Sequence, residues 1–258
     1  MPSQEVDVVK LPRRGLALIA SDLHGNLKDF HKLLQIWQNT PVKDKHLIFT
    51  GDFIHAMGTK EADNSLELLE EIQLDCKKYP GFHLLLGNHE WATITGNPVY
   101  KGGVNQSLIF EKLLKDKYGS RWKVKLAEYS HFFKKLPVAV KTSNGVFISH
   151  SGPPENVKSL RQIMNITRRG YSANQSLFEL LWRRYHDYSK QDVDQFLEAV
   201  GCQAMIVGHT PVDGYKLYGN QLIISSSYTK GRKAYVELDL KKDISNGGDL
   251  KKMVRYLR

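Results

Sequence analysis

Cysteine is scarce in this sequence, and long apolar runs are absent from it. Cys76 and Cys202 are the only cysteines among 258 residues, too few for a disulfide framework and too scattered for a thiolate metal site. No segment approaches the roughly 20 apolar residues that a membrane-spanning helix needs. The first fifteen residues carry charged side chains and lack the apolar core of a secretory signal. We therefore expect a cytoplasmic protein with two reduced, buried thiols and no membrane contact.

Acidic residues are outnumbered by basic ones, with 27 Asp and Glu against 37 Lys and Arg, which gives a net charge of +10. Such a charge favours an anionic substrate or partner. The basic residues of the C-terminal stretch 241–258 are not interleaved with aromatic side chains in the way that single-stranded nucleic acid binding requires. A nucleic-acid-binding module or nuclease is therefore an alternative that rests on charge alone, and it predicts strongly salt-dependent binding.

Short apolar runs alternate with helical spacing in the first part of the chain. Residues 16–21, 46–50 and 82–86 have the length and apolar character of buried strands. Apolar residues at helical spacing follow the first two of these strands, at 27–37 and 64–79. Repeated units of strand, loop and helix are typical of an α/β protein with a mainly parallel sheet.

The rest of the chain predicts a helical insert followed by further helices and hairpins. Residues 105–135 have a helical pattern rich in charged and aromatic residues, and the turn sequences Asn144-Gly145 and Gly219-Asn220 predict two β-hairpins. Further helices are expected at 157–169, 175–187 and 191–200, and further strands at 204–207 and 233–240. Because no linker or repeat divides the chain, we predict one domain over residues 1–258, with a core at about 16–240 and a short basic C-terminal extension.

Five predicted strands end in segments that carry Asp, Asn or His. These segments are Ser21-Asp22-Leu23-His24, Gly51-Asp52, Gly87-Asn88-His89-Glu90, Ser149-His150 and Gly208-His209. The carboxyl ends of parallel strands meet at one edge of a sheet, so these side chains should converge. An ordinary loop would explain any one segment, but loop composition favours Asp and Asn and does not favour repeated His. The combination therefore predicts one shared site.

The predicted site has the composition of a metal cage. Its candidate ligands are Asp22, His24, Asp52, Asn88, His150 and His209. Carboxylate oxygens and imidazoles without thiolates suit Mn²⁺, Fe or Zn²⁺, and six ligands are more than one ion needs. Two divalent ions about 3.5–4 Å apart can bind the attacking and the leaving oxygens of a displacement at phosphorus. We therefore expect two divalent metal ions, with Mn²⁺ the first candidate, and phosphoester hydrolysis.

The order and spacing of these segments resemble those of the calcineurin-like metallophosphoesterases over about residues 16–240. The segments that resemble most the phosphoprotein phosphatase branch, the serine/threonine phosphatases, in their bacterial or archaeal form are Asn88-His89-Glu90, Leu180-Leu181-Trp182 and Ser225-Ser-Ser-Tyr228. This resemblance implies a four-layer α/β/β/α sandwich with a helical insert. It also implies the ligand roles: Asp22 and His24 on the first metal, Asp52 as a bridge, and Asn88, His150 and His209 on the second.

The same resemblance implies roles for two residues beside the cage. His89 would protonate the leaving alkoxide, a general-acid task that suits imidazole near neutral pH. Tyr228 matches a family position near the phosphate, although a tyrosine packed at a strand end explains it equally well.

One segment departs from the phosphatase pattern. That branch usually has Gly-Asp-x-x-Asp-Arg-Gly, in which the second Asp orients the catalytic His and the Arg binds phosphate, whereas this chain has His55, Ala56 and Met57 at those places. His55 is a candidate partner of His89 or of phosphate, or an ordinary loop histidine. Arg183 and Arg184 are candidates for the missing positive charge, because arginine suits bidentate binding of phosphate.

Three functions are compatible with such a cage. The first is a phosphomonoesterase that acts on phosphoserine or phosphothreonine in proteins. The second is hydrolysis of a small molecule, such as a diadenosine polyphosphate or a phosphodiester, which the missing Asp-Arg pair favours. The third is an inactive binding scaffold, which the presence of every expected ligand and of His89 disfavours. The sequence leaves the physiological substrate, the metals and the oligomeric state open.

Overall fold

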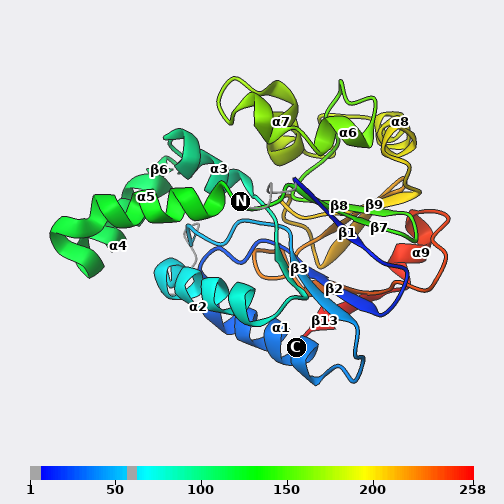
Figure 1. The fold of residues 1–258 in the computed structure, drawn as a ribbon, viewed down its shortest axis with the longest axis horizontal. Coiled ribbons are helices and arrows are strands. Elements are labelled where there is room, and N and C mark those ends of the chain that lie inside the picture. Colours follow the sequence, from blue (N-terminus) through cyan, green and yellow to red (C-terminus); the bar gives the residue numbers. More distant parts are fainter. Residues whose placement is uncertain (1–6, 57–62) are drawn as a thin grey trace, which may run out of the picture.

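The core of the protein is two β-sheets that pack face to face, with helices on both outer sides (Figure 1). The computed structural model describes residues 7–56 and 63–258. One sheet has the strand order β13-β12-β2-β3-β4. Its strands are β2 (Leu16–Ala20), β3 (Lys45–Phe49), β4 (Phe82–Leu84), β12 (Lys233–Asp239) and β13 (Val254–Leu257). The strands β2, β3 and β4 are parallel, as the repeated units predict, whereas β12 runs antiparallel to both of its neighbours, β2 and β13.

The second sheet is mixed, with the strand order β1-β7-β8-β9-β11-β10. Its strands are β1 (Val8–Leu11), β7 (Ala139–Thr142), β8 (Val146–Ser149), β9 (Ala204–Val207), β10 (Tyr215–Tyr218) and β11 (Gln221–Ile224). The two predicted hairpins are present as β7–β8 and β10–β11. The strand β8 pairs in parallel with β9, so the loops after these two strands lie at the same edge of the sheet.

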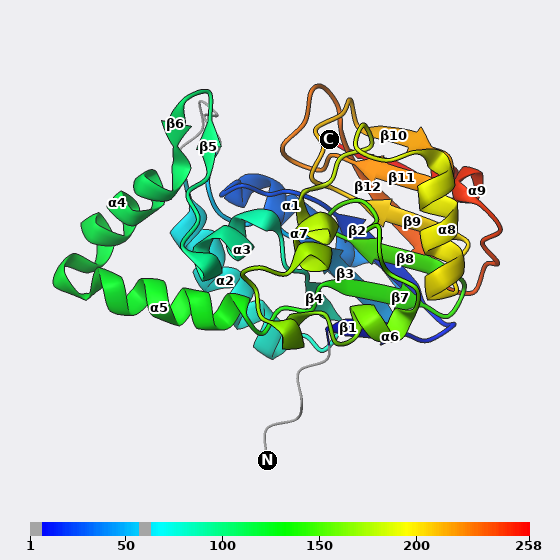
Figure 2. The same cartoon turned by 90° about the horizontal axis from the view of Figure 1, so that it is seen from above.

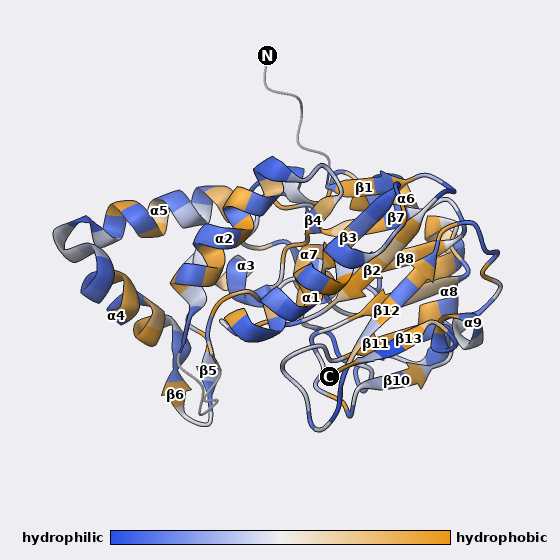
Figure 3. Ribbon diagram, turned by 90° about the horizontal axis from the view of Figure 1, so that it is seen from below, coloured by the Kyte–Doolittle hydropathy of each residue, from blue (hydrophilic) through white to orange (hydrophobic). Residues whose placement is uncertain are grey.

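Alternate side chains of the strands pack on opposite faces of each sheet. In β2, Ile19 belongs to the core between the two sheets together with Ile148 of β8, whereas Leu18 lies in the core that contains Phe30 of the first helix. The outer layers consist of α1 (Leu27–Asn39) and α2 (Ser65–Lys78) on one side, and of α6 (Leu160–Ile163), α7 (Gln175–Trp182) and α8 (Lys190–Val200) on the other (Figure 1). Hydrophobic and hydrophilic residues alternate along α1 and α2 (Figure 3), as expected for helices with one face on a sheet. The expected four-layer sandwich is confirmed.

A helical insert projects from one end of the sandwich (Figure 2). It consists of α3 (Asn88–Thr95), β5 (Tyr100–Lys101), β6 (Val104–Asn105), α4 (Gln106–Tyr118), the 3₁₀ turn η1 (Gly119–Arg121) and α5 (Trp122–Phe133). The small hairpin β5–β6 was not predicted from the sequence. Its two-residue turn is Gly102-Gly103, with φ of 53° and 78°, a conformation that glycine adopts without a steric penalty.

Two other segments differ from the expectations. The helix expected at 157–169 is broken into α6 and the 3₁₀ turn η2 (Thr167–Arg169). The stretch expected as a C-terminal extension contains α9 (Gly247–Lys251) and β13, which pairs with β12 and so completes the first sheet. Among the helices of the described residues, none has both the length and the apolar character to span a bilayer.

Candidate active site

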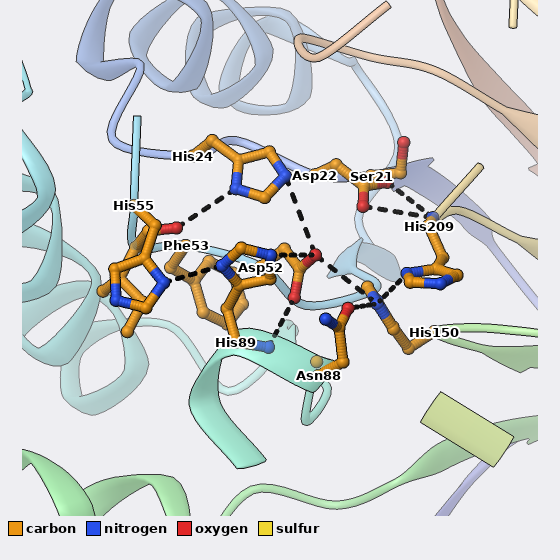
Figure 4. Close-up of polar contacts among 12 residues, drawn as sticks. Ser21, Asp22, His24, Asp52, Phe53, His55, Asn88, His89, His150 and His209 are labelled. Atoms are coloured by element: carbon orange, nitrogen blue, oxygen red, sulfur yellow. Dashed lines mark hydrogen bonds and ion pairs between the residues drawn. The ribbon is translucent and has the colours of Figure 1, made fainter. Parts of the chain in front are cut away.

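The loops at the carboxyl ends of five strands meet in one buried cluster (Figure 4). The loop after β2 contains Asp22 and His24, the loop after β3 contains Asp52, α3 begins at Asn88 after β4, and His150 and His209 follow β8 and β9. All six side chains lie at positions less than 10% exposed, from 0% at His150 to 7% at His209. The structure therefore brings together every predicted ligand.

The backbone is strained at this cluster. Asp22, His24, Asp52, His55 and His209 have φ values of 39°, 45°, 57°, 68° and 62°, in the left-handed region that non-glycine residues rarely adopt. Such conformations cost on the order of 1–3 kcal/mol each and persist where the surrounding structure enforces them, commonly at functional sites. Ala173 is the sixth non-glycine residue with positive φ in the described part of the chain. Backbone strain is therefore concentrated at the predicted cage.

Backbone carbonyl groups fix the orientation of three cage histidines. His24 Nδ1 donates to Ile54 O at 3.1 Å, His150 Nδ1 donates to Thr50 O at 3.0 Å, and His209 Nε2 donates to Trp182 O at 3.1 Å. In a neutral imidazole, the nitrogen that does not donate presents a lone pair. The lone pairs of all three rings therefore face the cage, the arrangement that metal-binding histidines adopt.

The two cage carboxylates are buried close to each other. Burial raises the pKa of Asp22 to about 7, although the hydroxyl of Ser21 and the N–H of His209 oppose the rise. Burial and then the charges of Glu90 and Asp22 raise the pKa of Asp52 well above its usual value. Two nearby carboxylates away from water repel each other, and a cation between them would remove this repulsion.

The ligand atoms of the cage are arranged to bind a cation rather than to hydrogen-bond with one another. His150 Nε2 lies 2.8 Å from Asn88 Oδ1, 3.2 Å from His209 Nδ1 and 3.5 Å from Asp52 Oδ2. Since His150 Nδ1 carries the proton, these contacts bring lone pairs against lone pairs. Two groups of side chains have the geometry to bind an ion, namely His24, Asp52 and His89, and Asp52, His150 and His209. Asp52 belongs to both groups, as a bridging ligand would.

Glu90 fixes the loop that carries Asp52, a role that the sequence did not reveal. Its carboxylate accepts hydrogen bonds from the N–H groups of Asp52 and Phe53, both at 2.8 Å, and of Gly87 at 3.1 Å. A Cβ on Gly87 would lie 2.4 Å from Asp52 Oδ1, so the glycine is required for this close approach. The Asn88-His89-Glu90 segment placed Glu90 near the predicted site, but it did not predict that Glu90 binds the backbone of the Asp52 loop.

His89 and His55 form a buried pair beside the cage (Figure 4). Their Nδ1 atoms lie 2.7 Å apart, and His89 Nε2 lies 3.9 Å from Asp52 Oδ2. Burial and then the nearby histidines lower the pKa of His89, and burial lowers the pKa of His55 to about 3. The structure thus places His55 against His89, where the phosphatase pattern has an Asp.

The two arginines after Trp182 have different surroundings. Arg183 donates to the carbonyl groups of Pro153 and Asp187 and forms an ion pair with Glu155 at 3.0 Å. Arg184 Nε lies 3.3 Å from His209 Nε2, and its charge opposes the effect of burial on the pKa of Asp22. The structure therefore brings Arg184 to the cage, and Arg183, the other candidate, binds the neighbouring loop.

Tyr228 lies at the edge of the cage with a lysine over its ring. Its N–H donates to Asp22 O at 3.1 Å, and its ring stands edge-on to that of His24, with 5.0 Å between the centroids. Lys101 Nζ lies 3.8 Å from the centroid of the Tyr228 ring. The predicted position of Tyr228 near the site is thus present in the structure, whereas no sequence signal pointed to Lys101.

A two-sheet sandwich with a buried cage of carboxylate and imidazole donors at the strand ends is the architecture of a metal-dependent phosphoester hydrolase. Residues 16–213 match the model of the calcineurin-like phosphoesterase family, and the chain belongs to this family. The family is dinuclear and metal-dependent, and its members hydrolyse phosphoesters. The expected family and fold are therefore confirmed.

Similar proteins include several phosphatases. A probable serine/threonine-protein phosphatase of Encephalitozoon cuniculi is 29% identical over 238 residues, and the match covers 85% of this chain and 48% of that protein. The chain thus spans about half the length of this curated relative. A serine/threonine phosphatase from Saccharomyces cerevisiae with similarity to human phosphatase PP5 has a TM-score of 0.71 at 20% identity, covering 94% of this chain and 82% of the other. A cold-active protein-tyrosine phosphatase of Shewanella sp. has a TM-score of 0.62 at 17% identity, covering 99% and 85%. These two likenesses show the shared fold.

Proposed function

We propose that this protein is a phosphomonoesterase of the serine/threonine phosphatase type with two divalent ions, preferably Mn²⁺. The observation that carries the proposal is the position of His89, whose Nε2 lies 3.9 Å from the shared cage carboxylate of Asp52. This geometry puts a proton donor beside the atoms where phosphate would bind. The curated relative named as a serine/threonine-protein phosphatase supports the same substrate class.

Each part of the site has a proposed task in this reaction. Two bound ions would supply Lewis-acid activation of the phosphate and of the attacking water. Six buried side chains would bind the ions: Asp22, His24, Asp52, Asn88, His150 and His209. Four of them, His24, Asp52, His150 and His209, belong to the two groups with the geometry to bind an ion. His89, as an imidazolium that the charge of a bound phosphate dianion would favour, would give its Nε2 proton to the leaving oxygen and be left as a neutral ring. His55 would orient the His89 ring through the contact between their Nδ1 atoms. Tyr228 and Arg184 lie at the edge of the cage, where the phosphate oxygens would be bound.

A substrate panel tests this proposal against hydrolysis of diesters or dinucleotides by the same cage. The manganese-loaded protein would be assayed with phosphoserine and phosphotyrosine peptides, an aryl phosphate, a bis-aryl phosphate and a dinucleoside polyphosphate. We expect kcat/KM for a phosphoserine peptide or the aryl monoester to exceed that for the other two classes by at least about tenfold. Faster cleavage of the dinucleotide than of every monoester would assign the protein to the second class instead. Absence of both metal binding and hydrolysis would indicate a scaffold.

The adjacent arginines provide a matched pair of variants. Arg184→Ala should raise KM for a phosphomonoester by about 10- to 100-fold, because a hydrogen bond to a charged group contributes roughly 1.5–3 kcal/mol. Arg183→Ala should leave KM near the wild-type value and lower the thermal unfolding temperature, since its contacts to Pro153, Asp187 and Glu155 are structural. Steady-state kinetics and thermal unfolding of both variants show which of the two arginines binds the phosphate. The reverse pattern would move the phosphate contact to Arg183.

A further inference from the structure

The phosphatase pattern expects an arginine at the position of Ala56, so a phosphate-binding charge is missing from the loop after β3. Arg184 supplies one positive charge at the cage. A phosphomonoester is a dianion, and a site for it usually has more than one cationic or N–H donor around the oxygens. The helical insert contains a second cationic side chain beside Tyr228, at the edge of the cage.

That cation is Lys101, the last residue of β5. It extends over the ring of Tyr228, with Nζ 3.8 Å from the ring centroid, and Tyr228 in turn contacts the ring of His24. Lys101 therefore lies at the edge of the cage, on the same side as Tyr228.

Lys101 and Arg184 both lie at the edge of the cage, Lys101 over the Tyr228 ring and Arg184 beside His209. Among the described residues, neither side chain forms an ion pair with a carboxylate. Burial and then the charge of Arg184 lower the pKa of Lys101, the sign expected for two cations that repel each other in a partly buried place. An anion bound between the two side chains would remove this repulsion, and a phosphate group has the charge to do so.

The hairpin that presents Lys101 is held at its base by the first residues of α4. At the base, Val99 O accepts from Gln106 N at 2.8 Å, and Val99 N donates to the hydroxyl of Ser107 at 3.1 Å. At the tip, a Cβ added to Gly102 or Gly103 would meet no atom of residues 7–56 or 63–258 within 4 Å. The contacts at the base fix the direction of the hairpin, and so the place of Lys101 at the edge of the cage.

We propose that Lys101 of the β5–β6 hairpin is a substrate-binding residue, which together with Arg184 binds the phosphate oxygens in place of the arginine that Ala56 replaces. This inference rests on the proposed phosphomonoesterase function. It assigns a specific task to the β5–β6 hairpin, which brings Lys101 to the cage and so favours dianionic monoesters over monoanionic diesters.

The test compares Lys101→Met with Lys101→Arg in the manganese-loaded protein. Lys101→Met keeps an apolar chain over Tyr228 and removes the charge, whereas Lys101→Arg keeps the charge. We expect Lys101→Met to weaken the binding of inorganic phosphate, measured by titration calorimetry, by about 10- to 100-fold. Lys101→Arg should remain within a few fold of wild type. The loss in kcat/KM should be larger for an aryl monoester than for a bis-aryl diester.

Lys115→Met is the matched control. Lys115 belongs to the same insert and also lies over an aromatic ring, with Nζ 4.4 Å from the centroid of Trp122, but it pairs with Glu111 and not with the site. This variant should bind phosphate as wild type does. Phosphate affinity of folded Lys101→Met within twofold of wild type would overturn the inference, as would equal losses in Lys101→Met and Lys101→Arg. If wild type hydrolyses no monoester, the proposed function fails, while the phosphate titration still decides the role of Lys101.

Discussion

Asp52→Asn is expected to lower turnover of a phosphomonoester by about 10³-fold or more, because metal ions contribute several kcal/mol to such reactions and Asp52 belongs to both candidate metal groups. The same variant should make the metal-free protein as stable as wild type or more stable. Burial and the neighbouring carboxylates of Glu90 and Asp22 disfavour the charge of Asp52, and asparagine removes that charge while its oxygen can still accept the N–H of His89. Thermal unfolding with and without Mn²⁺ measures both effects.

A metal that binds only the folded protein raises its unfolding temperature. Wild type should therefore be stabilised by Mn²⁺, and Asp52→Asn should lose this stabilisation. Asp213→Asn is the control, since Asp213 pairs with Arg232 at the surface and lies outside the cage. If Asp52→Asn unfolded at a lower temperature than wild type without metal and responded normally to Mn²⁺, Asp52 would be a structural residue rather than a bridging ligand.

The central strands were predictable because both of their faces are buried. β2 and β3 are short apolar runs, and the helices that follow have apolar residues at helical spacing, so local pattern and final packing agree. The strand β13 was not predictable in this way. It lies at the edge of its sheet, and Arg255 and Tyr256 at its centre are exposed, so it lacks the apolar run that marks a buried strand.

The break in the helix expected at 157–169 has a specific cause. The carboxylate of Asp7 accepts hydrogen bonds from the N–H of Thr167 at 3.0 Å and from its hydroxyl at 2.6 Å, so this N–H does not donate to Ile163 O as it would in a continuing helix. This contact joins residues that come together only in the folded chain. The apolar spacing of the segment contained no information about it.

The convergence of the six proposed ligands was predictable because each follows a strand, whereas the positions of the residues around them depended on three-dimensional detail. α7 ends at Trp182, and Arg183 has an extended backbone with ψ of 138°. Consecutive side chains of an extended segment point to opposite sides, so Arg183 and Arg184 diverge and only one of them contacts the cage residue His209. A sequence that reads Arg-Arg does not indicate which one. Lys101 was missed for a similar reason, since its hairpin has strands of only two residues.

His89→Ala is expected to lower turnover of a phosphoserine peptide by about 10²–10⁴-fold, the effect of losing a general acid. The loss should be smaller for 4-nitrophenyl phosphate, because nitrophenolate is a good leaving group that needs little help from a proton donor. Mn²⁺ should still raise the unfolding temperature of the variant, since the six proposed ligands remain. Kinetics on both substrates and thermal unfolding with Mn²⁺ measure these outcomes.

His186→Ala is the control, because His186 lies against Tyr185 rather than against a cage residue, and it should leave both activities unchanged. Two results would contradict the role proposed for His89. Loss of the Mn²⁺ response would make His89 a metal ligand, which its grouping with His24 and Asp52 permits. Equal losses on both substrates would show that His89 does not protonate the leaving oxygen. The contact between His55 Nδ1 and His89 Nδ1 would then orient a ring that binds phosphate rather than one that donates a proton.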